Sequence, residues 1–150
     1  MKGLRANDRG RKSQESKTKF QKTIQSEKIA KAEADGAKPR DLEDRTFLFA
    51  QSVRKLVKQL PKTISNLEDV RQLVRASGSV AANWIEADEA LSKKDFVFRV
   101  KICRKEAKES RLFLRLVDAE PGTNLRPEAL SAEARELVLI FASIASKATL

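Results

Sequence analysis

Residues 92–117 read SKKDFVFRVKICRKEAKESRLFLRLV and carry the most regular helical pattern in the chain. Apolar side chains recur along this stretch at three- and four-residue spacings, which is typical of one buried helical face. Ser92, followed three residues later by Asp95, has the pattern of a helix N-cap. We therefore expect a helix that begins after Ser92. Its buried stripe should hold Phe96, Val100, Cys103, Ala107, Leu114 and Val117.

Two further helices are predicted before this stretch. Apolar residues at helical spacing run over residues 41–60, and Pro61 should end that helix because proline lacks the amide hydrogen that a helix interior needs. Ser65 and Glu68 then form a capping-box pattern for the next helix, whose apolar positions continue toward Ala90.

Gly78 lies inside the pattern of that second helix. A glycine in a helix interior costs about 1 kcal/mol relative to alanine, so its presence indicates either a bend or the close approach of a neighbouring helix. We favour the close approach.

A fourth helix is predicted after a turn. Residues 120–124, EPGTN, have the composition of a turn, and residues 129–147 return to helical spacing. Four helices of similar length joined by short connections pack most simply as an antiparallel up-and-down bundle. The predicted fold class is therefore all-α, with a four-helix bundle over residues 41–150.

Residues 1–40 differ from the rest in composition. They hold twelve lysines and arginines against five acidic residues, so most of the formal net charge of +10 lies here and only +3 is left for the bundle. Isolated apolar residues without a steady stripe bury too little surface to offset the cost of ordering. The segment is interpreted as a flexible, disordered basic arm, or as a solubilising extension or start-site artefact.

Composition also limits the kinds of catalytic and metal-binding site that the chain could form. The chain has no histidine and one cysteine, so it lacks the commonest neutral-pH base and cannot form an internal disulfide, which fits a reducing cytoplasm. Cys103 falls on an apolar face, where a buried small hydrophobe is favoured over a reactive thiol. The sequence predicts no catalytic residues, no metal site and no cofactor, hence no enzyme. No segment is apolar enough for a membrane span or a secretory signal.

Cations gather on one flank of the helix over residues 92–117. Projected at about 100° per residue, eight of them fall within an arc of roughly 120°. Their mutual repulsion would be relieved by an anionic ligand such as phosphate, and the alternative is a solvated face whose long stems cover the core edge. The candidate nucleic-acid-binding residues are Lys93, Lys94, Lys101, Arg104, Lys105, Lys108, Arg111 and Arg115.

The same helix carries a second apolar group, on sides that the first stripe does not occupy. Such a helix needs more than one neighbour, which the bundle itself or another subunit can supply. Together with Phe47 and Leu48 on the first helix, this group predicts self-association. Its members are Phe98, Ile102, Leu112, Phe113 and Leu116.

Four segments carry a resemblance to a known family. They are LVKQLPKT at 56–63, QLVRASGSVAANWIEA at 72–87, SKKDF at 92–96 and KEAKES at 105–110. Over residues 41–148 the chain resembles the four helix bundle protein family, also called the 23S rRNA-intervening sequence proteins, which includes accessory proteins of diversity-generating retroelements. The arm is not covered.

The resemblance implies a set of site residues and an assembly. The family's polar pattern on the second helix corresponds to Arg75, Ser79, Asn83 and Glu86, interpreted as a structural network that fixes helix packing or subunit contact. Many members have glycine after that glutamate, where this chain has Ala87. The resemblance further implies a barrel-like homopentamer with a basic surface and no known enzymatic activity, whose retroelement members bind a reverse transcriptase and RNA.

The resulting functional prediction is a non-enzymatic, oligomeric helical bundle that binds the backbone of RNA or DNA in the cytoplasm, away from membranes. Few aromatic residues are present, which favours backbone electrostatics over base stacking. An accessory role beside the reverse transcriptase of a diversity-generating retroelement is the finer form of this hypothesis. The alternative is a protein-interaction scaffold with incidental nucleic-acid affinity.

Overall fold

The computed structural model describes residues 39–150, and within this range the regular secondary structure is entirely helical. The four helices are α2 (Pro39–Val57), α3 (Ile64–Asp88), α4 (Lys93–Leu116) and α5 (Pro127–Ala148). The all-α prediction is therefore confirmed. Most of the predicted basic arm lies outside the described residues, whereas its last two positions, Pro39 and Arg40, belong to α2.

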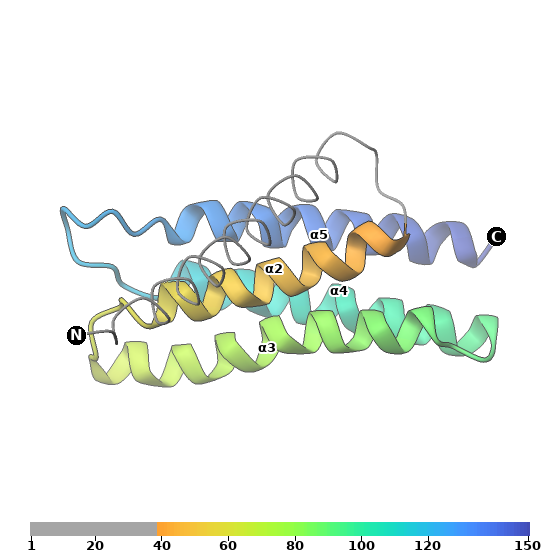
Figure 1. The fold of residues 1–150 in the computed structure, drawn as a ribbon, viewed down its shortest axis with the longest axis horizontal. Coiled ribbons are helices and arrows are strands. Elements are labelled where there is room, and N and C mark those ends of the chain that lie inside the picture. The colour runs from red at the N-terminus through yellow and green to blue at the C-terminus, as the bar shows by residue number, and fades with distance from the viewer. Residues whose placement is uncertain (1–38) are drawn as a thin grey trace, which may run out of the picture. The chain divides into compact units, whose positions relative to one another are not determined.

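The four helices pack as an up-and-down bundle in which successive helices run in opposite directions (Figure 1). Helix α4 lies between α3 and α5 and packs extensively on both. Helix α2 packs mainly on α3, crosses the bundle obliquely and makes a smaller contact with α5. One side of α4 is thus left free of neighbouring helices in the part of the chain that the structure describes.

The core is formed by the apolar stripe of each helix. Val53, Leu73, Val100 and Leu137, one from each helix, are fully buried, and burying a side chain of this size contributes about 1.5–3 kcal/mol. Trp84 packs edge-on against Phe96 at 6.5 Å between ring centroids. The stripe predicted for α4 is buried as expected, apart from Phe96, which is partly exposed.

The capping prediction holds for α4 and is wrong for α3. The Ser92 side chain accepts a hydrogen bond from the Asp95 amide at 3.1 Å, as a helix N-cap does. Helix α3 begins earlier than predicted, because Thr63 rather than Ser65 caps it and accepts from the Asn66 amide at 3.2 Å. Ser65 lies in the first helical turn instead, where its hydroxyl is 3.3 Å from that of Thr63.

Two other helix boundaries differ from their predicted positions by a few residues. Helix α2 ends at Val57, ahead of Pro61, and the Gln59 amide closes the following turn on the Leu56 carbonyl. Helix α5 starts at Pro127, two residues before the predicted position, because proline suits a first turn whose amides have no partner within the helix.

Gly78 faces the end of a side chain of α2, and not the backbone of that helix as the predicted close approach of two helices would require. A Cβ atom built at Gly78 would lie 3.1 Å from Nη2 of Arg54, a side chain of α2. The same guanidinium donates through Nη1 to the Ala50 carbonyl at 3.1 Å, which fixes it against the helix. The glycine thus leaves room for an arginine laid across the contact between α2 and α3.

Candidate nucleic-acid interface

The eight predicted nucleic-acid-binding cations all lie on α4, since the helix spans Lys93–Leu116. Seven are exposed to solvent and Arg111 is half-buried. We call these eight residues the cation strip. Lys93 and Lys101 line a pocket together with Ala148 and Thr149 at the end of α5, which places this part of the strip beside α5.

None of the eight side chains forms an ion pair with a carboxylate of residues 39–150. The acidic residues of α4 are engaged elsewhere: Asp95 lies 3.8 Å from Arg99, and Glu109 pairs with Arg75 of α3 at 3.0 Å. These two carboxylates are thus paired with arginines that do not belong to the cation strip. Within the described range, the charge of the strip is not neutralised by neighbours.

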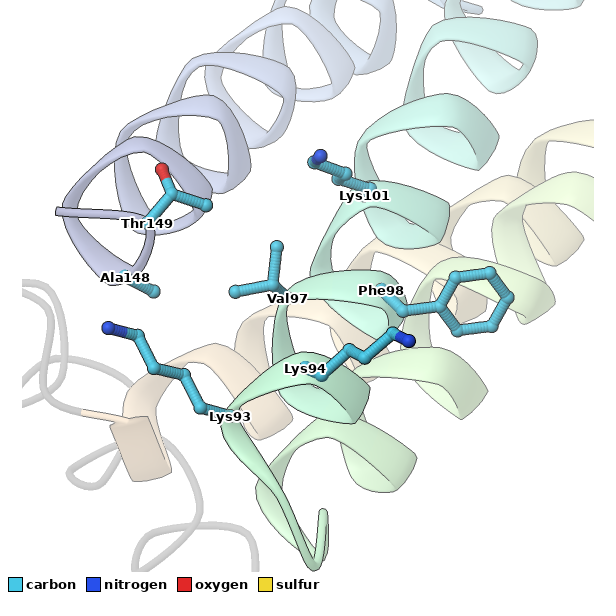
Figure 2. Close-up of a pocket in the computed structure, with 7 residues that line it drawn as sticks. All are labelled: Lys93, Lys94, Val97, Phe98, Lys101, Ala148 and Thr149. Atoms are coloured by element: carbon cyan, nitrogen blue, oxygen red, sulfur yellow. The ribbon is translucent and has the colours of Figure 1, made fainter.

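The pocket at the start of α4 combines this charge with apolar surface. Figure 2 shows Lys93, Lys94 and Lys101 around Val97, with the end of α5 across from them. The pocket is shallow and open, encloses about 570 Å³ and is lined mostly by apolar atoms. Such a site suits a ligand with a negatively charged group and an apolar part.

The predicted polar pattern of α3 makes its contacts with α4. Arg75 pairs with Glu109 at 3.0 Å and lies 4.0 Å from Glu106. Glu86 lies 3.9 Å from Arg99 of α4, and the amide oxygen of Asn83 accepts a hydrogen bond from Arg99 at 3.3 Å. These polar side chains thus join α3 to α4 within one subunit.

Ser79 contributes to this set only through its backbone, because its carbonyl accepts a hydrogen bond from the Asn83 amide nitrogen at 2.9 Å. Arg99 is the residue that sequence reasoning missed. It contacts Asn83 and Glu86 of α3 as well as Asp95 of its own helix. The Asp95 to Arg99 spacing of four residues is typical of a helical ion pair and was the available signal.

Glu106 is a buried carboxyl group at the edge of this contact, with 8% of the residue exposed. Burial raises its pKa above the ordinary 4.5, and the neighbouring Glu109 charge raises it further, whereas Arg75 acts in the opposite direction. Its Oε2 atom has no hydrogen-bond partner in residues 39–150. The neutral, protonated form is therefore favoured relative to a carboxylate in water.

Cys103 lies in the core, where its thiol donates to the Val80 carbonyl at 3.6 Å. Burial raises the pKa of the thiol to about 12, so almost no thiolate is present at neutral pH. No cluster of three or more histidine, cysteine, aspartate or glutamate side chains arranged for a metal ion occurs in residues 39–150. None of the helices described here is long and apolar enough to cross a membrane.

Comparison with known proteins gave a family and a structural relative. A sequence model of the family described as 23S rRNA-intervening sequence protein matches residues 41–138. No curated protein matched the chain. The chain is similar to the crystal structure of a protein of unknown function from the S23 ribosomal protein family of Bacteroides thetaiotaomicron VPI-5482, with 27% sequence identity and a TM-score of 0.62. That likeness covers 73% of this chain and 99% of the relative.

The family match extends from the third residue of α2 into the second half of α5, so it includes the whole of α3 and α4 with the polar contacts between them. The chain belongs to the 23S rRNA-intervening sequence protein family.

Proposed function

We propose that this protein is a non-enzymatic binding subunit that holds RNA through the phosphate backbone, with the cation strip as its main contact surface. The observation that carries the proposal is the charge distribution on α4. Glu109 pairs with Arg75 of α3 and Asp95 with Arg99 of its own helix, whereas the eight cations have no ion partner in residues 39–150. A polyanion would relieve the repulsion among these cations and release its own counterions on binding.

Two further points support RNA over other acidic ligands. The family is described as 23S rRNA-intervening sequence protein, and the structural relative is a protein of unknown function from the S23 ribosomal protein family. Exposed lysines and arginines suit backbone contacts that are indifferent to base sequence, and Phe98 is the one exposed aromatic side chain of α4. We propose that this binding takes place in the cytoplasm and that the subunit is part of a homo-oligomer, with the pentamer as the first assembly to test.

The finer role that we propose is that of an accessory factor to the reverse transcriptase of a diversity-generating retroelement. This role requires a reverse transcriptase gene beside the coding sequence and a complex between the two proteins. Co-purification of the two proteins after nuclease treatment would support it, and a genome context without such a gene would contradict it.

The main test is a charge reversal on the strip in the full-length chain. Lys101, Arg104, Lys108 and Arg115 are all exposed, so replacing them with glutamate should leave the core unchanged. Fluorescence anisotropy with labelled duplex and single-stranded RNA, over a range of KCl concentrations, would give affinity and its salt slope. We expect loss of binding at 150 mM salt and a slope smaller by roughly three to four, about 0.7–0.9 for each phosphate contact removed.

A matched control variant distinguishes the effect of the cation strip on RNA affinity from the effect of total net charge. Lys55, Lys58, Lys62 and Arg71 are also exposed, and they lie on α2, α3 and the turn between them. Their reversal changes the total charge by the same amount as the strip variant. The proposal expects this control to keep most of its affinity. Equal losses in the two variants, or full binding by the strip variant, would contradict the assignment.

A second candidate function is the docking of an acidic protein, with incidental affinity for nucleic acid. It is favoured by the pocket beside Val97, whose lining combines mostly apolar atoms with the side chains of Lys93, Lys94 and Lys101. A partner that remains bound after nuclease treatment, and is lost when Lys93 and Lys94 are reversed, would favour this function over RNA binding.

A further inference from the structure

The outward side of α4 carries a ridge that no helix covers in residues 39–150. Phe98 is 57% exposed, Leu112 49% and Leu116 50%, and these three apolar side chains share one side of the helix. The positions along this ridge alternate in steps of four and three residues, which is the spacing of a coiled-coil seam. We call it the α4 ridge, and it consists of Phe98, Ile102, Lys105, Glu109, Leu112 and Leu116.

The α4 ridge of one copy is complementary to the α4 ridge of a second copy that runs in the opposite direction. Its members are placed symmetrically on either side of Ala107, so rotation about that point brings Phe98 opposite Leu116 and Ile102 opposite Leu112. The central position then places the ammonium group of Lys105 opposite the carboxylate of Glu109. Every apolar residue meets an apolar residue. Lys105, which is also a member of the cation strip, meets Glu109, whose carboxylate also pairs with Arg75 at 3.0 Å.

We propose that two copies of this chain associate through antiparallel pairing of their α4 ridges, with Ala107 at the two-fold axis. Parallel pairing would place Lys105 against Lys105 and Glu109 against Glu109, so the charges select the antiparallel orientation. The contact is isologous, because the same surface is used by both copies. It therefore closes after two copies.

The pairing has an electrostatic consequence for the cation strip. A two-fold axis perpendicular to both helices keeps each strip on the same side of the pair, so the two strips form one continuous basic surface. Their repulsion opposes association, and a single helix-to-helix contact is smaller than a standard stable interface. Association should therefore be weak at low salt and become stronger with added salt or with a polyanion.

The first experiment uses two single charge reversals in the full-length chain, Lys105→Glu and Glu109→Lys. Each variant alone would place like charges at both central positions of the pair. Mixed together, one variant supplies two anions and the other two cations, so both central contacts become attractive. Sedimentation velocity in 300 mM salt should show the wild type and the mixture associating, and each variant alone at least fivefold weaker.

The second experiment tests the register with single cysteines. In the antiparallel pair Phe98 lies beside Leu116 of the other copy, whereas the two Phe98 positions are roughly 27 Å apart at 1.5 Å per residue. A mixture of Phe98→Cys and Leu116→Cys should therefore form a disulfide dimer under mild oxidation, and neither variant alone should do so. Cys103 is buried and contributes no background.

The outcomes decide the proposal separately from RNA binding, because no nucleic acid is present in either experiment. Association of each charge variant equal to that of the wild type, or cross-linking of Phe98→Cys alone, would overturn the antiparallel ridge. Glu109 also pairs with Arg75, so thermal melting is needed to show that Glu109→Lys is folded. If that variant does not fold, the cysteine mixture decides alone.

Discussion

The side chain of Asn66 and the backbone of Asp118 are joined by two hydrogen bonds across one end of the bundle. The amide nitrogen of Asn66 donates to the Asp118 carbonyl at 2.9 Å, and its amide oxygen accepts from the Asp118 amide at 2.9 Å. The same nitrogen also donates to the Pro61 carbonyl at 2.9 Å. One buried side chain in the first turn of α3 thus holds both the connection before α3 and the segment that follows α4.

Replacing Asn66 with alanine should destabilise the fold by about 2–4 kcal/mol, because the three hydrogen bonds and the packing of this buried side chain would be lost. Urea unfolding followed by circular dichroism should show a lower midpoint with an unchanged slope. Asn124→Ala is the matched control, because Asn124 is exposed and its loss should stay within about 0.5 kcal/mol. Equal stability of the two variants would contradict the bridging role.

Gly78→Ala should stabilise the protein by up to about 1 kcal/mol, since alanine favours the helix and the added methyl group meets only the end of the Arg54 side chain, which needs to shift by a few tenths of an ångström. Thermal melting of Gly78→Ala in the wild type and in an Arg54→Ala background would measure how much contact with the Arg54 side chain reduces the stability gained from alanine. The gain should be equal or larger without the arginine. Destabilisation in both backgrounds would mean that the backbone, rather than Arg54, limits this position.

Glu106→Gln should increase stability at neutral pH. The raised pKa of Glu106 means that the fold favours the protonated carboxyl, so its contribution is present below pH 4.5 and is lost as pH rises through the folded-state value. Glutamine is neutral throughout. Chemical unfolding of both proteins at pH 4 and pH 7 should therefore give a difference that favours glutamine more at pH 7. A difference that shrinks with rising pH would show that the Arg75 contact outweighs burial.

Cys103 should be inert in the folded protein. Its thiol is buried and has a pKa of about 12, so alkylation at pH 8 should proceed at the rate of unfolding and become fast only in denaturant. Reaction with a chromogenic disulfide reagent, with and without guanidinium, measures this directly. Rapid labelling under native conditions would show that α3 and α4 separate more easily than their packing indicates.

Periodicity was sufficient to predict α4, because its capping residue Ser92 and its buried stripe lie in one continuous stretch. It was less reliable at the start of α3. There both Thr63 and Ser65 are able to cap a helix, and the helix that starts after Thr63 also places Asn66 against Asp118, a residue far away in sequence. A local capping rule contains no information about such a contact.

In the candidate site, too, the residues within one helix could be predicted from the sequence and the contacts between helices could not. The cation strip follows from helical projection because its members share one helix. The partners of Arg75, Asn83 and Glu86 depend on the rotation of α3 against α4, which spacing within one helix does not determine. Arg99 was therefore missed, although it contacts both helices.

The sorting of charge around α4 has a kinetic consequence. A helix with its carboxylates on one side and its cations on the other has a transverse electric moment, which a charged polymer would align before any contact forms. A molecule that is already oriented for binding when it reaches its partner binds in a larger fraction of its collisions. Association with the polymer should then be fast at low ionic strength. Its rate should fall sharply with added salt, because the ions screen the electrostatic interaction at long distance.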